Sequence, residues 1–110
     1  MNIENHKEEN YTVLTISGEL DATSSIDLDY QIKNSFDSGE QNLLIDLKDL
    51  TYISSAGLGV FMSYVKDIET SNKKLILFNL NETIFDTFEI LGLHHIIPIV
   101  KTKQIARSLC

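Results

Sequence analysis

Apolar residues along the chain follow two kinds of spacing, and each kind predicts a different element. Short apolar runs that alternate with polar residues or are rich in β-branched residues predict five β-strands. The expected strands cover residues 3–7, 11–17, 43–47, 74–78 and 96–100. The runs LLIDL and KLILF are almost continuously apolar, which indicates strands buried on both faces of a sheet. Pro98 has no N–H to donate, so we expect the last strand at an edge.

Between the strands, apolar residues recur every three or four positions, which predicts helices. The clearest predicted helix covers residues 56–69. Its apolar face consists of Leu58, Phe61, Met62, Val65 and Ile68. Another helix is expected after Asn79, which has capping-box spacing to Glu82, and it should end at Gly92.

Two further segments are predicted to be helical with less regular patterns. They are residues 24–36, with Thr23 or Ser24 as the N-cap, and residues 102–109. Strands that alternate with helices imply right-handed crossovers and a largely parallel sheet. The sequence therefore predicts an α/β fold in a single domain, residues 1–110. We expect a mixed, mostly parallel sheet of four to five strands with an N-terminal antiparallel hairpin and about four helices.

The composition narrows the classes of function. The chain has 110 residues and a formal net charge of −7, which disfavours binding to nucleic acid because phosphate backbones are repelled. The only cysteine is Cys110, so no disulfide can form within the chain. No apolar run is long enough to cross a membrane, and the polar N-terminus does not resemble a signal peptide. We expect a soluble, cytoplasmic monomer that binds no membrane.

The candidate chemistry lies in the stretch YISSAGLGV, where Ser54 and Ser55 precede the clearest helix. In a parallel sheet, the loops from strands into helices share one edge, so this stretch should lie near the segments GELDATSS and NLNE. One serine could cap the helix, and one could present its hydroxyl for chemistry; both roles can coexist. Gly57 and Gly59 weaken the first turns of the helix, which suggests that something approaches the backbone closely.

Enzyme signatures are absent from this stretch and from the rest of the chain. The residues before Ser55 do not form the G-x-S-x-G elbow of hydrolases, and no phosphate-binding loop is present. His94 and His95 are adjacent and point to different sides, so they make a poor metal pair. By their local pattern, Glu19 and Asp21 are interpreted as solvated loop charges near this stretch. We therefore expect no catalytic residues, no metal and no cofactor.

The segments GELD, LLIDLKDLTYISSAGLGVFMSY and LGLHHIIPI resemble the STAS-domain family, and within it the bacterial anti-sigma factor antagonists. The resemblance covers nearly the whole chain and implies the STAS fold. The most specific part is S-x-G-L-G-V, which begins at Ser55. In the family, the serine at this position is phosphorylated by an anti-sigma factor that is itself a serine kinase.

The resemblance implies that the unphosphorylated chain binds such a kinase and releases the sigma factor, that phosphorylation of Ser55 turns binding off, and that a serine phosphatase resets the switch. This sequence has Ser54 where the family has an acidic residue. The alternative is a STAS subunit of a larger assembly, such as a stress-signalling scaffold or the cytosolic subunit of a lipid-transport ATPase, without a serine switch. The expected partner surface comprises Asp21, Ser54, Ser55, Gly57, Gly59 and Ser63.

Overall fold

The sheet begins with two antiparallel strands, β1 (Asn2–Lys7) and β2 (Thr12–Leu20), in a computed structural model that describes residues 1–110. They pair from Asn2 opposite Ser17 to Lys7 opposite Thr12. Three parallel strands follow, β3 (Asn42–Asp46), β5 (Lys74–Phe78) and β6 (Ile99–Val100), in the order β1-β2-β3-β5-β6. The predicted mixed, mostly parallel sheet with an N-terminal hairpin is confirmed.

A sixth strand, β4 (Leu50–Ile53), was missed by the sequence analysis, which placed these residues in a loop. It runs parallel to the end of β2 and pairs Leu20 with Ile53. Only the first and last of its four residues are buried, so the strand lacks an alternating pattern. The register shifts between Gly18 and Glu19, and this bulge accounts for the irregular pattern. The sheet therefore has six strands instead of four to five.

The last strand is also shorter than expected. Residues 96–100 were predicted as a strand, but only Ile99 and Val100 pair with β5. The carbonyl of Pro98 still accepts a hydrogen bond from the N–H of Leu77, at 2.9 Å. Pro98 cannot donate one in return, so regular pairing begins only after it. The predicted edge position is confirmed.

The helices are α1 (Ala22–Asp37), α2 (Ser55–Ser63), α3 (Val65–Thr70), α4 (Glu82–Ile90) and α5 (Lys103–Ser108), with a short 3₁₀ turn η1 (Leu93–His95). The single helix predicted over residues 56–69 is divided at Tyr64, whose N–H bonds to the carbonyl of Phe61 in a tightened last turn of α2. The apolar pattern continues across this junction, so it could not reveal the break.

Two of the predicted helix caps are wrong by two or three residues. The N-cap of α1 is Asp21, not Thr23 or Ser24: its carboxylate accepts a hydrogen bond from the N–H of Ser24 at 2.9 Å. The N-cap of α4 is Asn81, which accepts from the N–H of Ile84 at 3.0 Å. Asn79 instead has a φ of 60°, a left-handed conformation that turns the chain before the helix.

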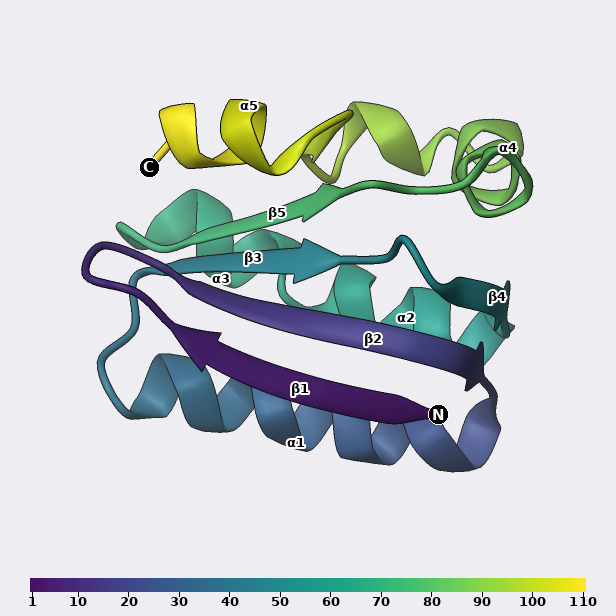
Figure 1. Ribbon diagram of the computed structural model, residues 1–110, viewed down its shortest axis with the longest axis horizontal. Helices are drawn as coiled ribbons and strands as arrows, with labels where there is room; N and C mark the ends of the chain where they lie inside the picture. Colours follow the sequence, from purple (N-terminus) through teal and green to yellow (C-terminus); the bar gives the residue numbers. More distant parts are fainter.

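Helices cover both faces of the sheet (Figure 1). On one face, α1, α2 and α4 pack against the larger core of 19 buried residues, which includes Leu28, Phe61 and Phe88. On the other face, α5 places Ala106 on a smaller cluster with Leu44 and Ile76. None of the helices combines the length and the apolar character that a membrane span requires. The N-terminus of α2 thus belongs to the face opposite α5.

Candidate functional site

The N-terminus of α2 separates the two serines into different roles. Ser54 is the N-cap: its hydroxyl accepts a hydrogen bond from the N–H of Gly57 at 3.1 Å, and its carbonyl accepts one from Leu58 at 3.0 Å. Ser55 is the first helical residue and is exposed, and its hydroxyl makes no hydrogen bond within the chain. Ser54 is therefore the serine that caps the helix, and the hydroxyl of Ser55 is exposed to solvent.

The position of this helix start is fixed by the end of the sheet. The N–H of Ser54 donates to the carbonyl of Leu20 at 2.8 Å, which continues the pairing of β2 with β4. Asn81 ties the next loop to the start of β4, since its side-chain amide donates to the carbonyl of Leu50 at 2.6 Å. Ser55 thus follows a short strand that is bonded to β2 at its end and to the loop before α4 at its start. The sequence analysis assigned no role to Asn81, although an Asn directly before Glu82 is a typical cap signal.

The two glycines of α2 have different environments. Gly57 is buried, and a Cβ atom there would lie 2.7 Å from Cγ and Cδ2 of Leu20 and 3.1 Å from Cγ1 of Ile53. The side chains that lie close to the backbone of Gly57 are therefore Leu20 and Ile53 of the chain's own core. Gly57 is removed from the expected partner surface. Gly59 is exposed, and a Cβ atom there would have no neighbour within 4 Å.

Asp21 lies beside this helix start, because it directly follows Leu20, whose carbonyl holds Ser54. It is exposed and forms a capping box with Ser24. Hydrogen bonds from the N–H and the hydroxyl of Ser24 lower the pKa of the Asp21 carboxyl, so it carries its negative charge at neutral pH. An acidic group is thus fixed at the edge of the site.

Ser63 lies at the other end of α2, eight residues after Ser55. Residues four positions apart share a helix face, so Ser55, Gly59 and Ser63 form one exposed stripe along α2. Two helical turns separate its ends by about 12 Å. The Ser63 hydroxyl donates to the carbonyl of Val60 at 2.6 Å and is therefore committed to its own helix.

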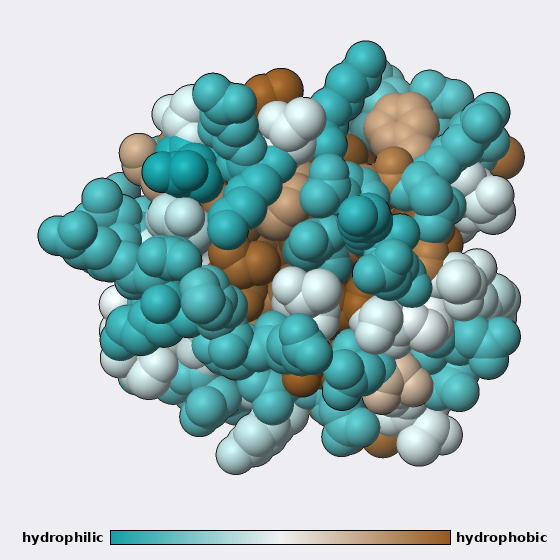
Figure 2. Space-filling model, in the orientation of Figure 1, coloured by the Kyte–Doolittle hydropathy of each residue, from teal (hydrophilic) through white to brown (hydrophobic).

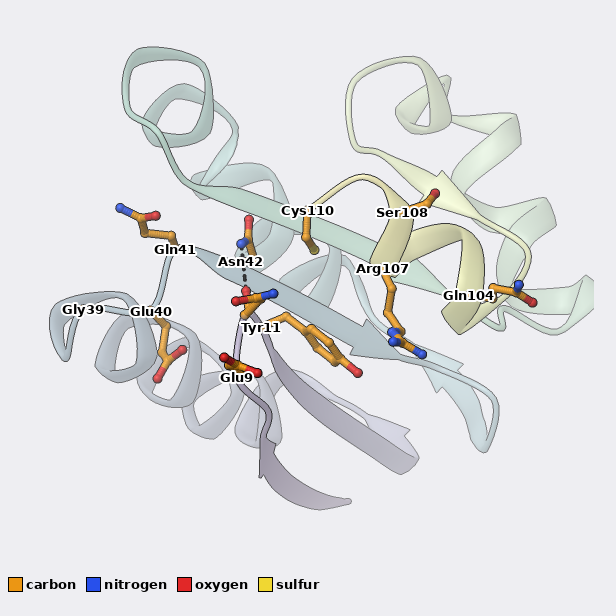
Figure 3. A pocket seen from close by; sticks show the side chains of 11 residues that line it. Glu9, Tyr11, Gly39, Glu40, Gln41, Asn42, Gln104, Arg107, Ser108 and Cys110 are labelled. Carbon is orange, nitrogen blue, oxygen red and sulfur yellow. Dashed lines mark hydrogen bonds between the residues drawn. The ribbon is translucent and has the colours of Figure 1, made fainter.

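The largest cavity of the molecule lies away from this stripe. It has a volume of about 680 Å³ and is lined mainly by polar side chains of the β1–β2 turn, the α1–β3 loop and α5 (Figure 3). Tyr11 and Asn42, which line the cavity, lie where β2 and β3 begin. Ser55 instead follows the end of a strand, β4. None of the expected site residues contributes to this cavity. Hydrophilic residues cover most of the face of the molecule that Figure 2 shows, which is the view of Figure 1.

The histidines form no metal site. The rings of His94 and His95 lie 3.9 Å apart between centroids, and His94 also contacts the ring of Phe85 edge-on. No group of three or more His, Cys, Asp or Glu side chains is arranged to hold a metal ion. The polar side chains near Ser55 are those of the Ser54 cap and of the capping box formed by Asp21 and Ser24, and they bond to helix N–H groups.

Comparison with known proteins gives consistent matches over most of the chain. The model of the STAS domain family matches residues 2–106. The anti-sigma-B factor antagonist of Listeria monocytogenes is 36% identical, with 76% of this chain and 74% of that protein covered. The anti-sigma-B factor antagonist of Staphylococcus aureus is 25% identical, with 96% of this chain and 97% of that protein covered.

Solved structures share the fold at lower sequence identity. An anti-sigma factor antagonist from Mycobacterium paratuberculosis has a TM-score of 0.87 at 18% identity, over 98% of this chain and 92% of that one. The antagonist SpoIIAA in its unphosphorylated form has a TM-score of 0.80 at 19% identity, over 97% and 94% of the two chains. Its phosphorylated form from Bacillus has a TM-score of 0.73 at 19% identity, with 97% of each chain covered.

Proposed function

The chain belongs to the STAS domain family, and we propose that it acts as an anti-sigma factor antagonist controlled by phosphorylation of Ser55. The unphosphorylated chain binds an anti-sigma factor serine kinase and so releases the sigma factor. Phosphorylation of Ser55 by that kinase ends the binding, and a serine phosphatase restores it. The observation that carries this proposal is the exposed, unbonded hydroxyl of Ser55 at the first position of α2. The names of the curated relatives support the class of function.

A phosphate on Ser55 is compatible with the fold. The first N–H groups of a helix have no partner within the helix, and the helix dipole favours negative charge at this end. The cap of α2 comes from Ser54, so modification of Ser55 leaves the bond between Ser54 and Gly57 in place. The phosphate adds about −1.5 to −2 charges to an exposed surface. The domain would therefore stay folded while the interface with the kinase is lost.

The surface around Ser55 indicates what kind of partner it accepts. Asp21 and Ser55 are exposed where this surface begins, at the N-terminus of α2, and Gly59 and Ser63 continue it along the helix. Small residues let a partner surface approach the helix closely. With a net charge of −7 on the chain, the partner surface should be basic. Since sigma factors act in the cytoplasm, we place this switch there, with the free antagonist as a monomer.

Ser54 gives the proposal its internal control. It stands where the family pattern has an acidic residue, and it is half-buried with its hydroxyl engaged in the cap. A kinase that reaches both serines should therefore transfer phosphate to Ser55, whose hydroxyl is free. Ser54→Ala would keep the acceptor and remove the cap, at about 1 kcal/mol of stability.

The decisive experiment incubates the wild type, Ser54→Ala and Ser55→Ala with the cognate kinase and ATP and maps phosphate by mass spectrometry. We expect phosphate on Ser55 in the wild type and in Ser54→Ala, and none in Ser55→Ala. Phosphate on Ser54, or none on the wild type with an active kinase, would contradict the switch. Isolation of a transporter ATPase or a large scaffold as the stable partner would favour the alternative, a STAS subunit of an assembly.

A further inference from the structure

Two large side chains of α1, Ile26 and Tyr30, are exposed although most of their surface is apolar. Ile26 is 70% exposed and Tyr30 is 67% exposed. They lie four residues apart on the helix, so their side chains are neighbours on one side of it. Single apolar residues scattered over a surface are normal, but a neighbouring pair on one helix face marks a candidate contact surface.

The pair lies on the solvent-facing side of α1, next to residues of the same helix that contact α2 or line a groove beside it. Asp29 follows Ile26 by three residues, and its carboxylate accepts a hydrogen bond of 2.7 Å from the hydroxyl of Tyr64 at the end of α2. Lys33 follows Tyr30 by three residues and lines a groove of about 320 Å³ with Tyr64 and residues of α3. The pair is therefore exposed beside the contact between α1 and α2 and is left free for a partner.

We propose that Ile26 and Tyr30 are the apolar anchors with which α1 extends the docking surface for the anti-sigma factor beyond α2. The inference rests on the proposed function, because it continues the surface that begins at Ser55 onto a second helix. The exposed stripe of α2 contains only small residues, including Gly59 and Ser63, and offers little apolar area of its own. The large side chains on the neighbouring helix supply that area.

The character of the anchors and of their surroundings defines the partner surface. A tyrosine presents a large rigid ring with a polar end, and tyrosine is enriched among the residues that dominate interface energies. Asp21 at the start of α1 and Asp27 beside Ile26 are exposed carboxylates on the same helix end. The matching surface of the anti-sigma factor should therefore contain an apolar pocket for Tyr30 with basic residues at its rim.

The experiment measures binding of the purified anti-sigma factor kinase from the source organism to four proteins by calorimetry. They are the wild type, Ile26→Ala, Tyr30→Ala and the matched control Ile105→Ala. Ile105 is also an exposed apolar residue, 44% exposed, but it lies on α5, and α5 covers the opposite face of the sheet. We expect Tyr30→Ala to weaken binding by about 30-fold and Ile26→Ala by about 5-fold. Ile105→Ala should bind like the wild type.

The outcomes separate this inference from the function on which it rests. Both α1 side chains are exposed, so the variants should melt near the wild-type temperature, and weaker binding will not reflect unfolding. Wild-type affinity in both α1 variants would remove α1 from the interface and leave the role of Ser55 standing. A loss in Ile105→Ala as large as that in the α1 variants would show that the effect is not specific to α1 and would overturn the inference. Failure of the wild type to bind would overturn the proposed function, and this inference with it.

Discussion

Gly59→Ala should make the isolated chain more stable and its complex weaker, and this opposition tests the docking surface. Gly59 is the fifth residue of α2, and a Cβ atom there meets nothing within 4 Å. Alanine is favoured over glycine in a helix interior by about 0.8–1.0 kcal/mol, with no steric penalty to subtract here. For a chain of 110 residues, such a gain corresponds to a rise in Tm of about 2–6 °C. The isolated protein is thus less stable with glycine at this position than it could be, and the docking surface that we propose would explain why glycine stands there.

Gly57→Ala is the matched control, two residues away in the same helix. Its Cβ atom would lie 2.7 Å from two atoms of Leu20, a side chain that is fully buried. Overpacking of this kind costs about 1–3 kcal/mol, which exceeds the gain in helix propensity, so the variant should be less stable by about 1 kcal/mol. Urea unfolding of both variants measures the stabilities, and calorimetry with the anti-sigma factor measures the affinities.

Two results would refute the reasoning about these glycines. If Gly59→Ala is more stable and binds the anti-sigma factor as tightly as the wild type, no partner contacts the helix at Gly59. If Gly57→Ala is more stable than the wild type, then Leu20 adjusts easily, and packing does not explain this glycine. A stabilised Gly59→Ala with weaker binding, beside a destabilised Gly57→Ala, is the expected pair of outcomes.

Four further predictions follow from the same contacts. Ser55→Glu should fold, because an acidic group suits the first turn of a helix, yet it should bind the anti-sigma factor poorly; wild-type affinity in a calorimetric titration would argue against the switch. Asp21→Lys should weaken binding, and unchanged affinity would remove Asp21 from the surface. Because the pKa of Asp21 is lowered in the folded chain, its cap contributes stability above about pH 3.9, and this stability is lost as the pH falls through the lower folded-state pKa. In acid titrations followed by circular dichroism, the stability of Asp21→Asn should therefore depend less on pH in that range. Tyr64→Phe should lose about 1 kcal/mol in urea unfolding, because it lacks the bond to Asp29. Burial raises the pKa of Tyr64, so the wild type should lose more stability than this variant as the pH rises above about 10.

The sequence predicted the parallel strands well because their apolar runs need burial on both faces, and a parallel sheet supplies it. It did not predict β4, since a strand of four residues that contains an extra, unpaired residue opposite β2 leaves no alternating pattern. The division of the helix at Tyr64 was also missed. Tyr64 keeps right-handed helical angles, and its hydroxyl is held by Asp29, 35 residues earlier in the chain. A contact of that range cannot be read from local spacing.

At the candidate site, the sequence located the right helix start but could not assign roles within it. Ser54 and Ser55 are both good N-caps by residue type, and the choice depends on where β4 ends. The carbonyl of Leu20 fixes Ser54 in an extended conformation, so the helix begins one residue later. The two glycines are equally ambiguous in the sequence, and only the position of Leu20 shows which one the core requires.

The division of roles between the two serines gives the proposed switch its physical basis. If Ser55 were the cap, a phosphate on its oxygen would alter the bond that starts α2, and the partner surface along that helix would change shape as well as charge. With Ser54 as the cap, that bond does not involve the oxygen that is modified. The expected effect of phosphorylation on the fold is therefore small, and its effect on binding arises from the added charge at the exposed edge. A Ser54→Ala, Ser55→Glu double variant tests this independence: its change in stability should equal the sum of the changes in the two single variants within about 0.5 kcal/mol. A much larger loss in urea unfolding would show that the two serines are coupled through the helix start.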